Sequence, residues 1–253
     1  MVRSPFRRPG AIEIPREEFR VVERRLFLRQ SLGLGALTLL TGCNTSNVDS
    51  VQQALRAVSR WNDRVQGWLF DPSKLAPVFP EIAITHPFPF NAYYGEDEVV
   101  EIDAEDYSLA LGGRIRERKV WTLPELYALP QTSQVTRHCC VEGWSAIGKW
   151  GGVVFRHFLE RIGADLSAKY VGFKCLDDYY TSIDMATALH PQTLLTFKFA
   201  DQILPPKYGF PMKLRIPTKL GFKNPKHIME IYVTNMYPGG YWEDQGYNWF
   251  AGL

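Results

Sequence analysis

The sequence lacks the common signatures of several redox and metal-binding proteins. Its 253 residues include four cysteines, with no Cys-x-x-Cys pair for a zinc site and no Cys-x-x-Cys-His for a covalent haem. No Gly-rich dinucleotide fingerprint follows a candidate strand. The sequence therefore indicates no zinc site, no covalently attached haem and no nicotinamide or flavin dinucleotide site.

The chain also lacks an apolar run of the roughly 20 residues that a membrane-spanning helix needs. A short apolar stretch, SLGLGALTLLTGC (residues 31–43), follows the basic segment ERRLFLRQ (residues 23–30). This order predicts a signal peptide over residues 1–43, and hence a periplasmic location. Arg24-Arg25 resembles the twin-arginine export motif, and Leu40 to Cys43 resembles a lipobox, in which Cys43 would carry a lipid anchor. The alternative is an amphipathic arm that happens to contain two arginines.

A basic surface for nucleic acid is missing as well. Residues 1–42 hold eight of the 29 basic residues and four of the 27 acidic ones, so residues 43–253 hold 21 basic and 23 acidic residues. The body of the protein is slightly acidic, and we expect no nucleic-acid partner.

The twin-arginine route carries folded proteins, so the leader predicts a cofactor that is inserted before export.

Residues 44–253 are predicted to form one domain of α+β class, with mixed sheets and flanking helices. Apolar spacing indicates a helix near residues 51–70, and five prolines in residues 71–90 predict an extended segment. Residues 98–113 alternate like a strand pair with Gly112-Gly113 as its turn. Further helices are expected at 122–130, 152–163 and 182–190, and further strands at 133–141, 168–178, 193–200, 212–217 and 227–234.

Two of the four cysteines, Cys139 and Cys140, are adjacent in the segment RHCCVEGWS. Successive side chains of a strand point to opposite faces, so His138 and Cys140 share one face and Cys139 lies on the other. A disulfide between adjacent cysteines is strained. Only one of the two thiols can therefore point into a given site, and three roles are open to it. It could be a buried structural group, a nucleophile activated by His138 or His157, or a soft thiolate that binds a metal whose other ligands come from a cofactor.

The segment CVEGWSAIGKWGGVVF (residues 140–155) resembles the catalytic segment of the sulfite oxidase family of molybdopterin enzymes, in the bacterial branch that includes periplasmic methionine sulfoxide reductase. HPQTLLTF (190–197), LPPKYGFPMKLRIP (204–217) and KLGFKNPKHI (219–228) follow in family order, and the resemblance runs from about residue 91 to residue 231. It implies the family's fold, one molybdenum-molybdopterin cofactor per chain and two-electron transfer of an oxygen atom.

The resemblance also implies which residues hold the cofactor. Cys140 would be the catalytic residue and the one protein ligand to molybdenum, which leaves Cys139 off the site. Cationic side chains and backbone N–H groups would bind the cofactor's phosphate. Read without the resemblance, the strand that carries Lys213 and Arg215 is a solvated edge strand. The full implied set of cofactor-binding residues is Asn91, Tyr94, Gly95, Cys140, Cys175, Tyr208, Lys213, Asn224, Pro225 and Lys226.

Three of these positions depart from the family pattern. Cys175 stands where Ser or Thr is usual, Tyr208 where Asn or His is usual, and Lys213 where Arg is usual. A lysine binds phosphate as a point charge, because it cannot make the two parallel hydrogen bonds of an arginine guanidinium. Glu142, two residues after the metal ligand, is expected to face the same side and to accept a hydrogen bond near it.

The resemblance implies oxygen-atom transfer at the sulfur of a small-molecule or protein-bound substrate. A sulfoxide reductase is the interpretation that we favour. Sulfite oxidases neutralise a dianion with several arginines, whereas no Arg follows the ligand here until Arg156. A sulfite dehydrogenase is the alternative, and a non-enzymatic lipoprotein with the same fold is a second one. The sequence ends at Leu253, before the family's immunoglobulin-like dimerisation domain, so we expect a monomer.

Electrons must reach such a site from outside, because we expect no haem and no iron–sulfur cluster in this chain. If Cys140 binds molybdenum and Cys43 carries a lipid, only Cys139 and Cys175 remain, which are too few cysteines to hold an iron–sulfur cluster. A separate electron-transfer protein is therefore predicted, and a membrane haem protein suits a lipid-anchored chain. The aromatic segment at residues 237–250 is either its docking surface or a seal over the core.

Overall fold

The computed structural model describes residues 49–253, so the predicted leader, residues 1–43, lies outside the described residues. Contacts divide the chain into the units Met1–Ala57 and Val58–Leu253, and all of the strands below belong to the second. One domain over residues 44–253 therefore stays a prediction. In the described range, no helix combines the length and the apolar character that a membrane span requires.

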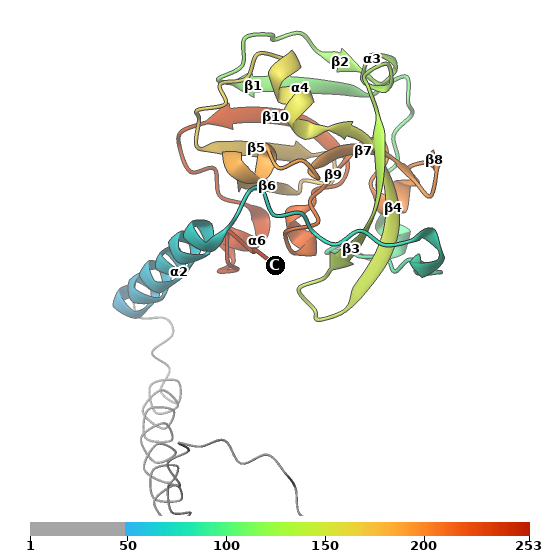
Figure 1. Cartoon of the computed structure of the whole chain (residues 1–253). Coiled ribbons are helices and arrows are strands. Elements are labelled where there is room, and N and C mark those ends of the chain that lie inside the picture. The colour runs from blue at the N-terminus through green and yellow to red at the C-terminus, as the bar shows by residue number, and fades with distance from the viewer. Residues whose placement is uncertain (1–48) are drawn as a thin grey trace, which may run out of the picture. The chain divides into compact units, whose positions relative to one another are not determined.

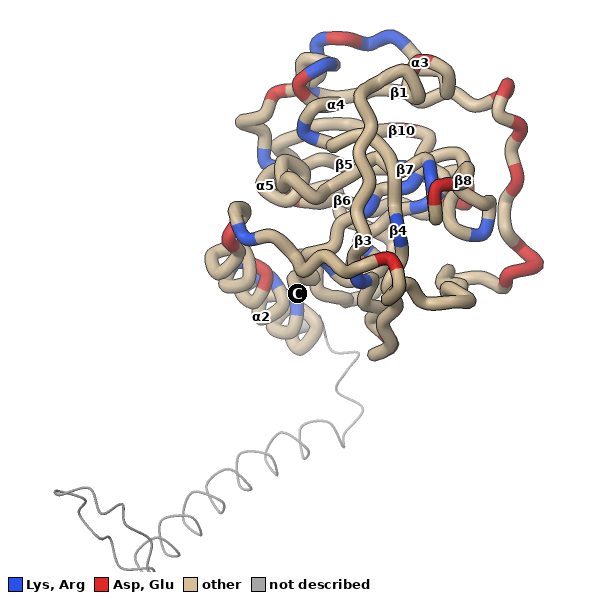
Figure 2. The backbone as a smooth tube through the Cα atoms, turned by 45° about the vertical axis from the view of Figure 1, so that its right-hand side comes forward, with Lys and Arg blue, Asp and Glu red and all other residues tan. Residues whose placement is uncertain are grey.

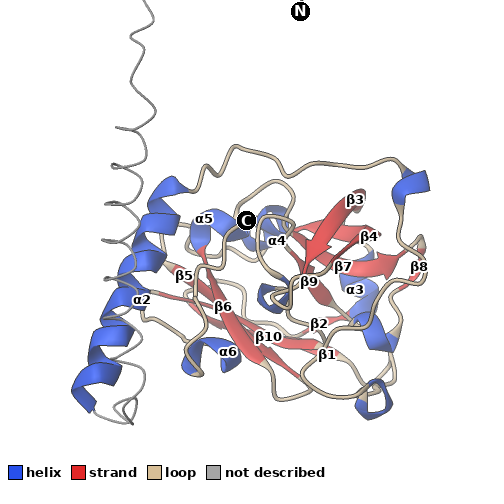
Figure 3. Ribbon diagram, turned by 90° about the horizontal axis from the view of Figure 1, so that it is seen from below, coloured by secondary structure: helices blue, strands red, loops and turns tan. Residues whose placement is uncertain are grey.

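Two five-stranded sheets form the frame of the described structure (Figure 1, Figure 3). Their pairing is antiparallel except between β1 and β10, which run parallel. The first sheet, in spatial order, consists of β2 (Trp121–Thr122), β1 (Ser108–Gly113), β10 (Ile228–Thr234), β5 (Tyr170–Cys175) and β6 (Tyr180–Asp184). The second consists of β3 (Thr132–Cys139), β4 (Ser145–Val154), β7 (Leu194–Phe199) and β8 (Gln202–Ile203), with β9 (Lys213–Arg215) paired to β7.

The described helices are short, apart from the first. They are α2 (Asp49–Leu69), α3 (Leu123–Tyr127), α4 (Phe155–Arg161), α5 (Met185–Ala188) and α6 (Tyr241–Asp244), with the 3-10 turns η2 (Glu81–Ala83), η3 (Glu96–Glu98), η4 (Pro206–Tyr208) and η5 (Gly221–Lys223). The predicted Thr122 cap is confirmed, since Glu125 closes a capping box with it at the start of α3. Mixed sheets with helices around them confirm the predicted α+β class.

Helix α4 joins the two sheets through the core. Its chain continues directly from β4 of the second sheet, yet its buried side chains pack on the first. The Phe155 ring lies 5.7 Å from Phe173 of β5, and the Phe158 ring lies 5.4 Å from Trp121 of β2. These fully buried rings hold the sheets together and so fix the end of β3, which lies beside β4.

The predicted strand pair over residues 98–113 is wrong. Only residues 108–113 form a strand, and β1 pairs with the distant β10 instead of a preceding strand. Gly113 has a φ of +72°, and a side chain there would collide with the carbonyl oxygen of Val233. The glycine therefore serves a close approach between β1 and β10, not a hairpin turn.

The helix predicted from residue 152 begins at Phe155, because residues 145–154 form β4, which the sequence did not suggest. Three glycines, Gly148, Gly151 and Gly152, weaken the strand signal, and the strand is held by pairing on both sides, with β3 and β7. Likewise, residues 182–184 of the predicted short helix belong to β6, and Asp184 then caps α5 through the Thr187 N–H.

Candidate functional site

Cys140 lies at the point where β3 ends and the chain reverses into β4. The Cys140 N–H donates to the Trp144 carbonyl at 2.9 Å, and the Gly143 N–H donates to the Cys140 carbonyl at 3.2 Å. Along β3, Thr136 and His138 are buried, and Cys140 continues their face into a cavity. Cys139 does not line this cavity, as the alternation predicts. Val141, which strict alternation would place on the face of Cys139, does line it, because β3 ends at Cys139 and the chain turns there.

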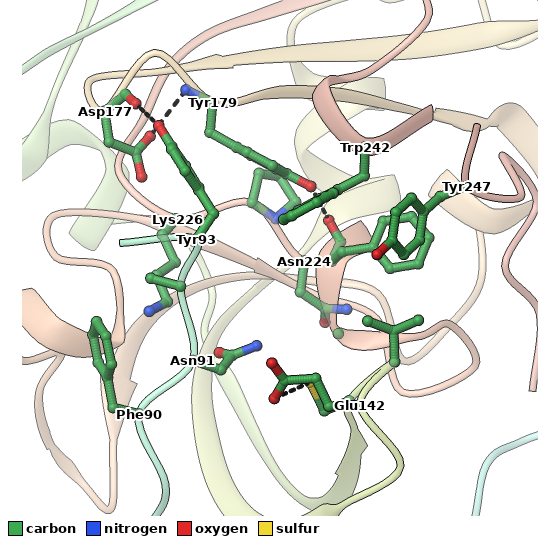
Figure 4. A pocket seen from close by; sticks show the side chains of 16 residues that line it. Phe90, Asn91, Tyr93, Glu142, Asp177, Tyr179, Asn224, Lys226, Trp242 and Tyr247 are labelled. Carbon is green, nitrogen blue, oxygen red and sulfur yellow. Dashed lines mark hydrogen bonds between the residues drawn. The ribbon is translucent and has the colours of Figure 1, made fainter. Parts of the chain in front are cut away.

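The cavity beside Cys140 has a volume of about 250 Å³ and is shown in Figure 4. Five separate stretches of the chain form its wall, at residues 90–93, 140–142, 177–179, 221–226 and 242–247. Five of the predicted site residues line it: Asn91, Cys140, Asn224, Pro225 and Lys226. Segments distant in sequence thus meet around the one thiol that the motif singled out.

Two more predicted residues lie just behind this wall. The Tyr94 hydroxyl donates to the Asp177 carboxylate at 3.1 Å, and Asp177 itself lines the cavity. Cys175, at the end of β5, is buried, and burial raises the pKa of its thiol well above the usual range. Cys175 is therefore an uncharged thiol close to Asp177 and Tyr94.

The other three predicted residues lie further from the cavity. Gly95 opens the turn η3 at the surface, where its N–H donates to Glu98 at 2.9 Å. Tyr208 donates from its hydroxyl to the Phe88 carbonyl at 2.6 Å, in a second aromatic core with Trp150. Lys213 is buried over the face of that Trp150 ring, 5.2 Å from its centroid.

Strand β9 is not the solvated edge that its charges suggested on their own. All three of its residues are buried, and the neighbouring cation Lys226 is almost so. Burial is the main cause that lowers the pKa of Lys213 well below the usual range, of Arg215 to about 9 and of Lys226 to about 8. Lys226 and Arg215 also lower the pKa of Lys213, and Lys213 and Lys226 both lower the pKa of the nearby His138 and His227.

No carboxylate within the described residues forms an ion pair with these three cations. Arg215 donates only to neutral oxygens, such as Asn224 at 3.0 Å, and its Nε has no partner. Lys226 donates to the Lys207 carbonyl at 2.8 Å. Of the three, Lys226 has acidic groups near it, since Asp177 and Glu96 raise its pKa against the effect of burial. Buried cations without an ion-pair partner are costly, so the cluster of Lys213, Arg215 and Lys226 fits an anionic group that binds beside the cavity.

His138 is a site residue that the sequence suggested only as a base for a nucleophilic thiol. Its Nδ1 is buried without a partner, and its Nε2 lies 3.4 Å from the Asn91 amide nitrogen. A side chain at Gly221 would come within 2.7 Å of the same Nε2, so a glycine is needed where η5 approaches the ring. Burial and the nearby cations lower the pKa of His138 well below its usual range, which keeps the ring neutral.

Glu142 follows the thiol and lines the cavity, as predicted. Its carboxylate lies 3.7 Å from the Cys140 sulfur and accepts the Trp144 indole N–H at 2.9 Å. Burial, more than this carboxylate, raises the pKa of Cys140. The free thiol is therefore protonated, and a metal ion would displace that proton on binding.

Six further residues of the wall are aromatic, and sequence reasoning missed them as site residues. They are Phe90, Tyr93, Tyr179, Phe222, Trp242 and Tyr247. The last two come from the segment 237–250, which seals the core: the Trp249 N–H donates to Ser182 at 2.9 Å, and Phe250 is buried. The density of aromatic residues in that segment was the available signal, but nothing local connected it to Cys140.

A buried ion pair joins the two sides of this wall. Lys223, in the turn η5 between the lining residues Phe222 and Asn224, pairs with Glu243 of α6. Glu243 also accepts from the Thr181 hydroxyl at 2.8 Å and immediately follows Trp242 in the wall. The pair therefore fixes the position of Trp242 relative to the loop that carries Asn224 and Lys226.

Comparison with known proteins identifies relatives of this chain. The sequence model of the family described as "Oxidoreductase molybdopterin binding domain" matches residues 96–242. A protein of Azospira oryzae, named "Putative protein-methionine-sulfoxide reductase subunit YedZ1", is 67% identical over 90% of this chain and 87% of its own length.

More distant relatives carry a related name. The protein-methionine-sulfoxide reductase catalytic subunit MsrP of Campylobacter jejuni is 27% identical over 87% of this chain and 76% of its own length. That of Burkholderia mallei is 32% identical over 54% of this chain, and the match spans about half of the relative, 46% of its length. Among solved structures, the sulfane dehydrogenase SoxCD of Paracoccus pantotrophus shares the fold, with a TM-score of 0.51 at 18% identity, over 55% of this chain and 40% of its own.

Proposed function

We propose that this chain, which belongs to the molybdopterin-binding oxidoreductase family, is a sulfoxide reductase that binds its molybdenum through Cys140. The chain's family makes it an oxidoreductase, and the relatives named as methionine sulfoxide reductases support the choice of a sulfur substrate. One observation carries the proposal: the Cys140 thiol opens into a cavity whose wall contains six aromatic residues.

The residues around the cavity fit the molybdopterin cofactor. The buried cations Lys213 and Lys226 form no ion pair with a carboxylate of the described residues and would hold its phosphate. Asn224 and Pro225, in the same wall, would contact the cofactor without a backbone donor, because the Asn224 N–H already donates to the Gly221 carbonyl and proline has no N–H. Asn91, whose side chain lies beside His138, also lines the cavity and would contact the cofactor. When bound, the cofactor supplies the transfer of one oxygen atom and two electrons at a sulfur centre.

The remaining predicted contacts belong to the same proposal. Tyr94 and Cys175 lie around Asp177, Gly95 follows Tyr94 at the start of η3, and Tyr208 lies in the aromatic core near Lys213. Tyr208 already donates its hydroxyl to Phe88, so its part is to position the chain around Lys213 and not to donate to the cofactor. The neutral Cys175 thiol provides a polarizable group where a hydroxyl is usual.

The wall favours a neutral substrate over the sulfite dianion. Of the residues that line the described cavity, Lys226 is the one cation, and it is accompanied by the acids Glu142 and Asp177. Rings such as Tyr93 and Trp242 bind the apolar groups of a sulfoxide and exclude water from its sulfur. Reduction to the thioether takes up two electrons and two protons and releases water.

We propose further that a separate electron-transfer protein, of the membrane haem class, supplies the electrons. The chain would act as a monomer in the periplasm, after twin-arginine export, with Cys43 as a lipid anchor that keeps it near that donor. Replacing Arg24 and Arg25 by Lys should retain loaded protein in the cytoplasm, and Cys43→Ser should release it from the membrane. Unimpaired export, or unchanged anchoring, would refute the corresponding step.

The two adjacent cysteines provide the test of the site. Cys140→Ser should show no turnover of methionine sulfoxide with an artificial dye donor, whereas the matched control Cys139→Ser should retain most of it. Each purified variant is also assayed with sulfite. An inactive Cys139→Ser with an active Cys140→Ser would overturn the ligand assignment, and turnover of sulfite alone would overturn the substrate assignment.

A further inference from the structure

Helix α2 has two opposite faces, and only one of them is used inside the protein. On the first face, Asp63 accepts hydrogen bonds from the Asn248 side chain at 2.6 Å and the Phe250 N–H at 2.9 Å. Gln66 accepts from the Gly252 N–H at 3.3 Å on the same side. These contacts fix the orientation of the helix segment 58–69 against the C-terminal residues.

The second face is apolar and, apart from the half-buried Val65, exposed. Val58, Trp61, Val65 and Trp68 follow one another at steps of three and four residues, so they form one stripe along the helix. Trp61 is 61% exposed and Trp68 is 82% exposed, and the adjoining Leu69 is 68% exposed. Because Trp61 and Asp63 point about 200° apart around the helix, the contacts of Asp63 hold this stripe toward solvent.

Positive charge borders the stripe. Arg64 lies three residues after Trp61 and four before Trp68, so it is next to both on the helix surface. Arg60 lies one turn before it, and both are exposed; Figure 2 colours basic positions along this helix blue. The one acid between residues 58 and 69 is Asp63, whose contacts are on the opposite face.

We infer that this face of α2, the stripe Val58–Leu69 with Arg60 and Arg64, binds the surface of a lipid bilayer with anionic headgroups. Tryptophan side chains favour the boundary between acyl chains and headgroups, and arginines beside them pair with lipid phosphates. A helix that combines both, outside the core of its protein, has the pattern of an interfacial helix rather than of a buried one.

The position of the helix in the chain points to the same partner. Helix α2 begins six positions after Cys43, the last residue of the apolar stretch 31–43. Whatever the conformation between them, about 20 Å is the most that such a tether can span. An anchor at Cys43 would therefore keep α2 close to the bilayer, but the inference concerns the helix face itself and holds with or without that lipid.

The test is the quenching of tryptophan fluorescence by brominated lipid, measured on the full chain with Cys43→Ser so that no lipid is attached. Vesicles of brominated phosphatidylcholine and phosphatidylglycerol should quench the wild-type sequence, and Trp61→Phe with Trp68→Phe should remove most of that quenching. The same exchange at a body position away from the cavity, Trp121→Phe, is the control and should leave it, because the Trp121 indole N–H has no hydrogen-bond partner to lose. Dye-driven turnover should be equal in all three, which shows that the site is intact.

Charge is tested in the same assay. Arg60→Gln with Arg64→Gln should weaken quenching on phosphatidylglycerol vesicles, by about 30-fold in the lipid concentration at half-effect, since each basic residue near the surface contributes roughly fivefold. Equal quenching of the wild type and the Trp61/Trp68 double variant would overturn the inference. So would a dimer in sedimentation that the two tryptophan changes dissolve, or binding of this face to a membrane protein but not to protein-free vesicles.

Discussion

The segment from Lys213 to Lys226 contains two sets of buried cations that the fold treats in opposite ways. Lys219 and Lys223 each have an acidic partner: Lys219 lies 3.5 Å from Asp184, and Lys223 pairs with Glu243. Lys213 and Arg215 are as deeply buried and Lys226 is nearly so, but no carboxylate of the described structure forms an ion pair with them. A few residues of one chain segment thus alternate between a neutralised and an unneutralised environment.

The difference separates a structural role from a binding role. The charge of a buried cation with a carboxylate partner is already neutralised in the folded protein. Here such a pair holds the aromatic tail, residues 237–250, to the loop that contains Asn224 and Lys226. The charge of a buried cation without a carboxylate partner is neutralised only when an anion binds. The unpaired set lies on the cofactor's side, beside His138 and Trp150, which is where the family's phosphate group is proposed to bind.

The largest expected effect comes from breaking the paired set. Lys223→Met leaves the Glu243 carboxylate buried without its cation, so the free energy of unfolding should fall by about 3–5 kcal/mol in urea titration. The double variant Lys223→Met with Glu243→Leu removes both charges and should recover most of that loss. A single variant that unfolds like the wild type would mean that the pair does not hold the tail.

The unpaired set should respond in the opposite way. Lys213→Met removes a buried charge without orphaning a partner, so the cofactor-free chain should be as stable as the wild type or more so. Its affinity for pyrophosphate, measured by calorimetry, should instead fall by about 10–100-fold, the value of a hydrogen bond to a charged group. Lys213→Arg is the matched control and should keep most of the affinity. A loss of stability equal to that of Lys223→Met would erase the distinction between the two sets.

A smaller effect is expected from pH. Burial lowers the pKa of Lys226 to about 8, so the side chain is protonated below that pH and neutral above it. Pyrophosphate binding by the cofactor-free chain should therefore weaken about tenfold between pH 7 and pH 9. Lys226→Arg stays charged over this range and should flatten the profile. An equally steep decline in that variant would assign the titration to another group.

The local part of this design could be predicted from the sequence. The alternation along residues 136–140 placed Cys140 and not Cys139 in the cavity, because the period of a strand needs only neighbouring residues. The Thr122 cap and most strand positions follow for the same reason. The family motif then supplied Asn91 and Lys226, both of which line the cavity.

The rest depends on contacts between distant segments. The parallel pairing of β1 with β10 joins residues 110–113 to residues 230–233, and no local pattern announces it. Asp177 and Trp242 reach the cavity only through the packing of the sheets and the tail. The burial of Lys213 could not be predicted from the sequence either, because a charged residue on a short strand is ordinarily exposed. Only contacts with distant parts of the chain bury it here.

The central claim is that the thiol of Cys140 and the unpaired cations together hold a molybdenum cofactor. Elemental analysis of protein purified from cells that make the cofactor tests it most directly. The wild type and Cys139→Ser should contain about one molybdenum per chain, whereas Cys140→Ser and the double variant Lys213→Met with Lys226→Met should contain little. Native protein free of molybdenum, or full occupancy in both of those variants, would contradict the account.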